Sequence, residues 1–271
     1  MSLAIALIVP GPDQARASTL PVITAPEAIV IDGWTGAVLY AKSDNVMRAP
    51  ASTVKIMTAL VVLRHRVPLN RVVSVGATAV AYGGSTAGLY AGERMTVWNL
   101  LHGMLLPSGN DAAIALSQTL AATPIQFAHL MNLQAERLHL WHTHYVTPNG
   151  FDTPGQVTTA HDLANLTRAA MQSRTFATIV DTKTWTARAA DGRGYHVWQS
   201  LNKLLWSSKI VDGVKTGTTP AAGACLVSSA RKGGKWIIAV NMGSTDASRF
   251  LDGAALLNYG FEVDGAAPST T

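Results

Sequence analysis

The sequence predicts an α/β (α+β) protein in which strands from both ends of the chain form one lobe and a helical segment is inserted between them. Strand-like apolar runs occur before residue 42 and again between residues 211 and 242. The chain between them is rich in alanine and leucine at helical spacing. With 271 residues, of which 48% are hydrophobic, the chain can bury a substantial core.

The N-terminal part predicts a hairpin followed by a helix. Residues 28–31 and 37–40 read as strands because they are apolar and are joined by a Gly-Trp-Thr-Gly turn. Residues 52–63 have helical composition, with apolar side chains on one face. The glycine-rich residues 72–92 are expected to be irregular.

The remaining elements follow from capping residues, turn residues and apolar runs. Thr96 is placed to cap a helix that stops at Pro107, and a turn at residues 232–234 separates two strands. Further helices are expected at 97–106, 111–121, 125–138, from 159 onward and at 247–259, and further strands at 211–215, 223–230 and 236–242.

These elements define the expected domain organisation. One catalytic domain covers residues 24–262. Within it, an antiparallel sheet flanked by helices comes from about 24–65 and 205–262, and an all-helical lobe from about 66–204. Residues 263–271 are expected to be a loose tail.

The first 23 residues resemble a truncated signal peptide and leader. Residues 2–9 are apolar, and Ala15-Arg16-Ala17 offers a small-residue cleavage pattern before Ser18, but a basic n-region is missing. The apolar run is too short to span a bilayer as a helix. We therefore expect an exported protein of the periplasm or cell wall; a frayed apolar N-terminus is the alternative.

Composition narrows the choice of partners. The net charge of +5 fits an anionic surrounding such as cell-wall polymer, or simply a mildly basic surface. Basic residues form no run and do not alternate with aromatic ones, which argues against nucleic acid. Cys225, the only cysteine, is expected to be a core residue. Three histidines between residues 139 and 144 lack metal-ligand spacing, so neither metal nor cofactor is expected.

A Ser-x-x-Lys motif at residues 52–55 offers a nucleophile and a base. Spacing of three places Ser52 and Lys55 on one face of a helix, and the helix N-terminus can stabilise developing negative charge. The motif alone is weak, because residues 229–232 also match it, and Ser52 could simply cap the helix. The second copy straddles a strand end and a turn, where the geometry differs.

Two further motifs complete a possible acyl-transfer site. Ser108-Gly109-Asn110 lies between two expected helices, where Ser108 can relay a proton and Asn110 can orient a substrate carbonyl. Lys215-Thr216-Gly217 lies on an expected edge strand, where Lys215 and Thr216 can bind a carboxylate and Gly217 leaves room for substrate. An ordinary turn and a solvated strand lysine are the respective alternatives.

The two lysines are expected to lie close together. Lysine acts as a base only when it is neutral, and its ordinary pKa is about 10.4. Burial and a second cation both lower that pKa, and Lys215 is the natural second cation for Lys55.

At these residues the sequence resembles the D-alanyl-D-alanine carboxypeptidase family of serine peptidases, the low-molecular-mass penicillin-binding proteins. The similarity covers about residues 24–262. It includes four segments besides the Ser-x-x-Lys motif itself, namely 48–52, 107–113, 143–150 and 212–218. Residues 202–205 also look like a family signature. The resemblance implies the fold shared by serine β-lactamases and penicillin-binding proteins.

The resemblance also implies residue roles. Ser52 would be the acylated nucleophile, Lys55 its general base, and Ser108 the proton relay, although which lysine deprotonates the serine is disputed in related enzymes. Substrate-binding roles would fall to Asn110, Lys215, Thr216, Gly217, Thr218 and Arg249. The backbone N–H groups of Ser52 and Thr218 would form the oxyanion hole.

The implied function is a serine-type D-Ala-D-Ala carboxypeptidase. It would remove the terminal D-Ala from peptidoglycan stem pentapeptides through a Ser52 acyl-enzyme, and β-lactams would acylate the same residue. The alternatives are a D,D-endopeptidase using the same residues and a catalytically silent penicillin-binding wall protein. A class A β-lactamase is disfavoured because no Glu-x-x-Leu-Asn segment follows the second motif. Unlike some relatives, the sequence shows no stable membrane anchor.

Overall fold

The computed structural model describes residues 19–264. The expected signal peptide cleavage site and most of the expected tail lie outside these residues. The expected boundaries of the two lobes stay a prediction, while the α/β fold class agrees with the arrangement described below.

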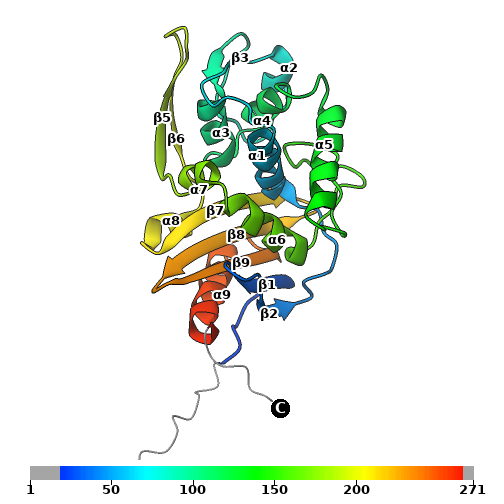
Figure 1. Ribbon diagram of the computed structural model, residues 1–271, viewed down its shortest axis with the longest axis vertical. Coiled ribbons are helices and arrows are strands. Elements are labelled where there is room, and N and C mark those ends of the chain that lie inside the picture. The colour runs from blue at the N-terminus through cyan, green and yellow to red at the C-terminus, as the bar shows by residue number, and fades with distance from the viewer. Residues whose placement is uncertain (1–18, 265–271) are drawn as a thin grey trace, which may run out of the picture.

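A five-stranded antiparallel sheet is the centre of the molecule (Figure 1). Its strand order is β2-β1-β9-β8-β7, so the two ends of the chain meet where β1 pairs with β9. The strands are β1 (Glu27–Asp32), β2 (Val38–Lys42), β7 (Val211–Thr219), β8 (Gly223–Lys232) and β9 (Lys235–Ser244). The predicted strands at both ends of the chain are therefore confirmed.

Helices cover both faces of the sheet. Alternate residues of each strand point to opposite faces, so the strands contribute side chains to a core on each side. Ala28 and Val30 of β1 pack into the core that contains Leu256 and Leu257 of α9 (Arg249–Val263). The residues between them, such as Ile29, belong to the larger core on the opposite face, which α1 (Lys55–Arg64) and α6 (Ala160–Met171) share. Cys225 is fully buried in this second core, as expected.

The middle of the chain forms a second region that packs around α1 (Figure 1). Eight of the ten residues of α1 are buried, which makes it the central helix of this region. Against α1 lie η1 (Ala51–Val54), α3 (Val97–Leu105), α4 (Asn110–Ser117) and α5 (Pro124–Arg137). Next to these, α2 (Ala77–Val80) packs on α4 and α7 (Arg174–Val180) packs on α3 and β7, whereas α8 (Lys203–Ser207) packs beside the sheet on β7 and α9.

Capping residues fix several of these helices as the sequence predicts. The Thr96 side chain accepts a hydrogen bond from the N–H of Asn99, and Thr159 caps α6 in the same way. Thr123 and Gln126 form a reciprocal capping box at the start of α5. Ser173 and Asn202 cap α7 and α8 in the same way, so five of the described helices carry a local start signal.

The expectation of an all-helical middle is wrong in detail. It contains two hairpins, β3 (Val72–Ser74) with β4 (Arg94–Thr96), and β5 (Thr184–Arg188) with β6 (Tyr195–Gln199). The segment expected to be irregular thus holds β3 and α2. The β5–β6 hairpin was missed because its pairing depends on packing against distant elements, which local pattern does not reveal.

Two expected helix boundaries are also corrected. Ser52 lies in the 3₁₀ turn η1 rather than in a regular α-helix, and the α-helix begins at Lys55. The last helix runs from Arg249 to Val263, four residues beyond its expected end, so it includes the first residue of the expected tail. No helix among residues 19–264 combines the length and apolar character needed to cross a membrane.

Candidate active site

Ser52 and Lys55 meet at the junction of η1 and α1. The Lys55 Nζ lies 2.8 Å from the Ser52 Oγ. Lys55 is fully buried, whereas Ser52 is half-buried and lines a cavity. The hydroxyl can therefore be reached from outside while its neighbouring amine is kept away from water.

The other two contacts of Lys55 leave one position on its nitrogen for the serine. The Nζ donates to the side-chain oxygen of Asn110 at 2.8 Å and to the backbone oxygen of Asn149 at 2.7 Å. A neutral amine has two N–H donors and one lone pair. With both donors used on these oxygens, the lone pair faces the hydroxyl of Ser52, which is the geometry needed to take its proton.

The surroundings of Lys55 favour this neutral form. Burial lowers its pKa well below the ordinary value, and the positive charge of Lys215 lowers it further. Asp111 acts in the opposite direction as the smallest cause. The sequence-based expectation that Lys215 is the second cation is therefore consistent with the geometry.

Lys215 lies on β7, at the edge of the sheet, and its side chain is buried rather than solvated. Its Nζ donates to the backbone oxygen of Thr216 at 2.8 Å. Burial, followed by the charge of Arg249, lowers the pKa of Lys215 to about 7. A buried cation with only a carbonyl oxygen as its partner is suited to bind a carboxylate.

Gly217 allows β7 to lie directly against η1. A Cβ atom at this position would be 2.9 Å from the backbone nitrogen of Ser52 and 3.0 Å from the Cβ of Ala51. Such contacts are too close, so only glycine lets the strand approach the nucleophile without displacing η1.

Arg249 is linked to the end of β7. Its Nη1 donates to the Thr218 Oγ1 at 2.7 Å, and its Nη2 lies 3.4 Å from the carboxylate of Asp246. Arg249 begins α9, so the helix places its guanidinium beside the strand. A second positive charge therefore lies next to the one on Lys215.

Ser108 is less directly engaged. It is buried, it has a left-handed backbone conformation with φ of 66°, and its Oγ has no hydrogen-bond partner. The structure thus brings Asn110 into contact with Lys55 but does not bring the Ser108 hydroxyl into a hydrogen bond with the other motif residues. Ser108 is also not among the residues that line the cavity at Ser52.

A cavity of about 170 Å³ joins these segments. The residues that line it are Ser52, Gly84, Ser85, Asn110, Asn149, Gly150, Phe151, Thr218 and Thr219. The sequence did not indicate the contribution of Gly84 and Ser85, because a glycine-rich stretch carries no motif. The sequence marked residues 143–150 only as a family signature and did not reveal the contact of Asn149 with Lys55.

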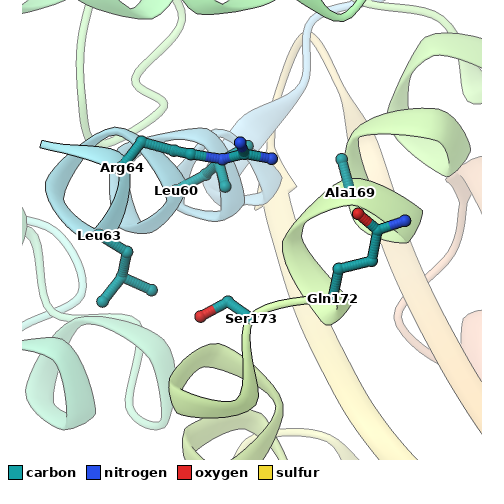
Figure 2. A pocket seen from close by; sticks show the side chains of 6 residues that line it. All are labelled: Leu60, Leu63, Arg64, Ala169, Gln172 and Ser173. Atoms are coloured by element: carbon teal, nitrogen blue, oxygen red, sulfur yellow. The ribbon is translucent and has the colours of Figure 1, made fainter. Parts of the chain in front are cut away.

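A second cavity lies at the other end of α1 (Figure 2). Its volume is about 220 Å³, and it is lined by Leu60, Leu63, Arg64, Ala169, Gln172 and Ser173. None of these residues belongs to the three motifs. No cluster of three or more His, Cys, Asp or Glu side chains suited to a metal ion occurs within the described part of the chain.

The fold and the site together place a half-buried serine beside a buried lysine, with a second buried lysine on the neighbouring edge strand, a set of groups suited to acyl transfer. The profile of the D-alanyl-D-alanine carboxypeptidase family matches residues 14–246. The chain belongs to this family of serine peptidases, as the motifs predict.

Similarity to individual proteins supports the same family. The D-alanyl-D-alanine carboxypeptidase of Streptomyces sp. strain K15 is 36% identical, over 93% of this chain and 92% of its own. DacD of Escherichia coli strain K12 is 38% identical over 89% of this chain, which spans only 64% of that relative. The crystal structure of the Streptomyces K15 DD-transpeptidase superimposes with a TM-score of 0.85, covering 90% of this chain and 99% of that one, at 36% identity.

Proposed function

We propose that this protein is a serine-type D-Ala-D-Ala carboxypeptidase that removes the terminal D-Ala from peptidoglycan stem pentapeptides. The observation that carries the proposal is the contact of Lys55 with Ser52, in a cavity lined on its other side by Thr218 and Thr219 of β7, the edge strand that also carries the buried Lys215. The names of the family and of the relatives support the same activity.

Acylation begins at Ser52. As its Oγ attacks the carbonyl carbon of the peptide bond, the hydroxyl proton moves to the lone pair of Lys55, and the carbonyl oxygen becomes an oxyanion. The backbone N–H groups of Ser52 and Thr218 are our candidates to hold this oxyanion. The Gly217 contact supports this assignment, because it brings β7 beside the nitrogen of Ser52.

The leaving amine then takes a proton. We assign the relay to Ser108, whose buried hydroxyl has no partner in the free protein. The proton that Lys55 received passes through this hydroxyl to the amine, the C–N bond breaks and D-Ala leaves. Water attacks the remaining ester with Lys55 again as the base, which releases the shortened peptide and restores Ser52.

Substrate orientation follows from charge and from the strand edge. The carboxylate of the terminal D-Ala would bind Lys215 and Thr216, with Arg249 adding positive charge. The penultimate part of the peptide would pair along the free edge of β7, and Asn110 would hold its amide. β-Lactams would enter the same way and acylate Ser52, because their carboxylate and amide carbonyl have a similar arrangement.

Transfer of the acyl group to an amine is a second candidate. The similarity to the Streptomyces K15 DD-transpeptidase favours it. The first half of the reaction is identical, and only the acceptor differs. Adding a free amino acid or amine to the assay distinguishes the two, since transfer gives a new amide product instead of the shortened acid.

The test is the release of free D-alanine from an acetylated Lys-D-Ala-D-Ala peptide by the wild type and by Ser52→Ala. Release that disappears in the variant supports the proposal. A folded wild type that forms no D-alanine and no transfer product contradicts it.

We also propose that the protein is exported to the periplasm or cell wall. The apolar residues 2–9 and the small-residue pattern before Ser18 support this proposal. Sequencing the N-terminus of protein recovered outside the cytoplasm tests it. Protein that remains in the cytoplasm with its full N-terminus would contradict export.

A further inference from the structure

One wall of the active-site cavity has no regular backbone pairing of its own. Residues 83–89 supply Gly84 and Ser85 to the cavity, and they lie in neither a helix nor a strand. Gly83, Gly84 and Gly88 have φ values of +70°, +70° and +75°, a conformation that favours glycine. The position of residues 83–89 therefore depends on hydrogen bonds from other segments of the chain.

The wall is bonded directly to the residue that orients Lys55. The Asn110 side chain donates to the backbone oxygen of Gly83 at 2.8 Å, and the Asn110 backbone donates to that of Ser85 at 2.8 Å. The same side chain accepts the hydrogen bond from Lys55. Any displacement of residues 83–85 is consequently passed to the contact between Asn110 and Lys55.

Asp111 holds the wall from the side of α4. Its buried carboxylate accepts hydrogen bonds from the backbone N–H of Ala87 at 2.8 Å and of Leu89 at 3.0 Å, and from the Thr86 hydroxyl at 2.6 Å. Hydrogen bonds to a charged acceptor are among the stronger ones in proteins.

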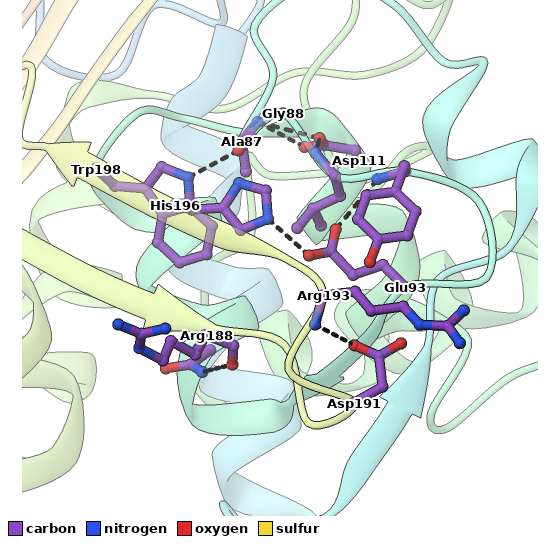
Figure 3. Close-up of polar contacts among 12 residues, drawn as sticks. Ala87, Gly88, Glu93, Asp111, Arg188, Asp191, Arg193, His196 and Trp198 are labelled. Atoms are coloured by element: carbon purple, nitrogen blue, oxygen red, sulfur yellow. Dashed lines mark hydrogen bonds and ion pairs between the residues drawn. The ribbon is translucent and has the colours of Figure 1, made fainter.

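The β5–β6 hairpin holds the same wall from the opposite side (Figure 3). The Trp198 Nε1 donates to the backbone oxygen of Ala87 at 2.7 Å, so both polar groups of the Ala87 backbone are bonded. Two residues earlier on β6, the His196 Nε2 lies 2.7 Å from the carboxylate of Glu93, which is fully buried. The other oxygen of Glu93 accepts from the backbone N–H of Tyr90.

We propose that Trp198 and His196 are positioning residues for acyl transfer. Trp198 acts on the wall formed by residues 83–89 through Ala87, and His196 acts through Glu93 and Tyr90, which directly follow that wall in the chain. Both effects reach Lys55 through Asn110, and neither residue touches the substrate. The β5–β6 hairpin thus helps to keep the Asn110 side chain in hydrogen-bond contact with the Nζ of Lys55. This inference rests on the proposed function only in taking acylation of Ser52 as its measured step.

The experiment compares Trp198→Phe with a matched control, Trp206→Phe. Trp206 also donates its Nε1 to a backbone oxygen, that of Ser200 at 2.9 Å, but it is exposed and does not contact the wall. We expect Trp198→Phe to lower the rate of acylation by benzylpenicillin about tenfold, which corresponds to about one lost hydrogen bond. Trp206→Phe should leave this rate within about twofold of the wild type, by the same estimate for a bond outside the site.

Amide hydrogen exchange separates positioning from a loss of stability. In Trp198→Phe, exchange should become faster in residues 83–93 and stay unchanged in 211–219, because the wall loosens while β7 keeps its pairing. Equal acylation rates in the two tryptophan variants, or faster exchange spread over the whole chain, would overturn the inference. A wild type that is not acylated at all would instead contradict the proposed function.

A second pair of variants keeps the test valid if Trp198→Phe unfolds. Part of the Trp198 ring packs against α3 at Gly103, so a smaller ring leaves a gap there. In His196→Ala the partner of Glu93 is lost, whereas in His196→Gln an amide can still donate to it. We expect slower acylation in the first and recovery in the second; unchanged acylation in His196→Ala would overturn the inference.

Discussion

The two walls of the active-site cavity are held in place by different means. On the sheet side, β7 is paired with β8 from Val211 to Thr219. On the opposite side, residues 83–89 have no strand partner and are held by the side chains of Asp111, Trp198 and Asn110. One half of the site is thus fixed by strand pairing, and the other mainly by a few side chains from other segments of the chain.

The largest effect is expected at the base that lies between the two walls. Lys55→Ala should lower acylation of Ser52 by about a thousandfold or more, because general-base catalysis supplies a factor of this order. The matched control is Lys232→Ala, which changes the exposed lysine of the second Ser-x-x-Lys segment. Rates of acylation by benzylpenicillin provide the measurement. Comparable rates in the two variants would remove Lys55 from the mechanism.

A substitution in β7, which forms the wall of the cavity on the sheet side, is expected to have the next largest effect on the rate. In Gly217→Ala the new Cβ would meet the backbone of Ser52 at 2.9 Å, so η1 must shift. Misplacement of a nucleophile by about 1 Å can cost about a hundredfold in rate. Gly76→Ala is the control, because its Cβ makes only ordinary contacts, the nearest at 3.5 Å. Peptide hydrolysis that survives in Gly217→Ala would show that the strand and η1 are less tightly coupled than proposed.

The sheet wall could be predicted from the sequence for a physical reason. A strand shows itself through an apolar run bounded by turns, and the Lys-Thr-Gly triplet lies inside such a run. Capping residues such as Thr96 and Thr159 similarly mark helix starts within three residues of sequence. Because these signals are local, the strands at both ends of the chain and the longer helices between them followed from the sequence, whereas the hairpins β3–β4 and β5–β6 did not.

The wall formed by residues 83–89 could not be predicted, because the contacts that hold it join residues far apart in the chain. Trp198 lies 111 positions from its partner Ala87, and His196 lies 103 from Glu93. Neither pair has a spacing or composition that marks it. The contact of Asn149 with Lys55 uses a backbone oxygen, which no motif search detects.

A substitution that loosens the wall formed by residues 83–89 should lower the acylation rate less than either of the first two substitutions. Asp111→Asn keeps the shape of the side chain but removes the negative charge that accepts bonds from Ala87, Leu89 and Thr86. We expect acylation to fall about tenfold, since the bonds are weakened rather than lost. Asp191→Asn serves as the control, because that exposed carboxylate holds only a turn. A loss above that of Gly217→Ala would reverse the comparison between the walls.

The last and smallest expected effect is a change in how the free energy of unfolding depends on pH. The folded protein lowers the pKa of Lys215 from 10.5 to about 7, so between these values the unfolded chain binds more protons. The free energy of unfolding should therefore rise as the pH increases from about 7 to about 10. In Lys215→Met the rise should be smaller, whereas Lys209→Met, at an exposed lysine, should keep the wild-type slope. Urea unfolding at several pH values measures this, and identical slopes would contradict the lowered pKa.

In the proposed mechanism the three motifs form a single site in which Ser52 carries the acyl group. Peptide mapping by mass spectrometry after brief exposure to benzylpenicillin tests it most directly. We expect one added penicilloyl group, located on Ser52 and absent from Ser52→Ala. A penicilloyl group on any other residue, or none on a folded wild-type protein, would contradict it.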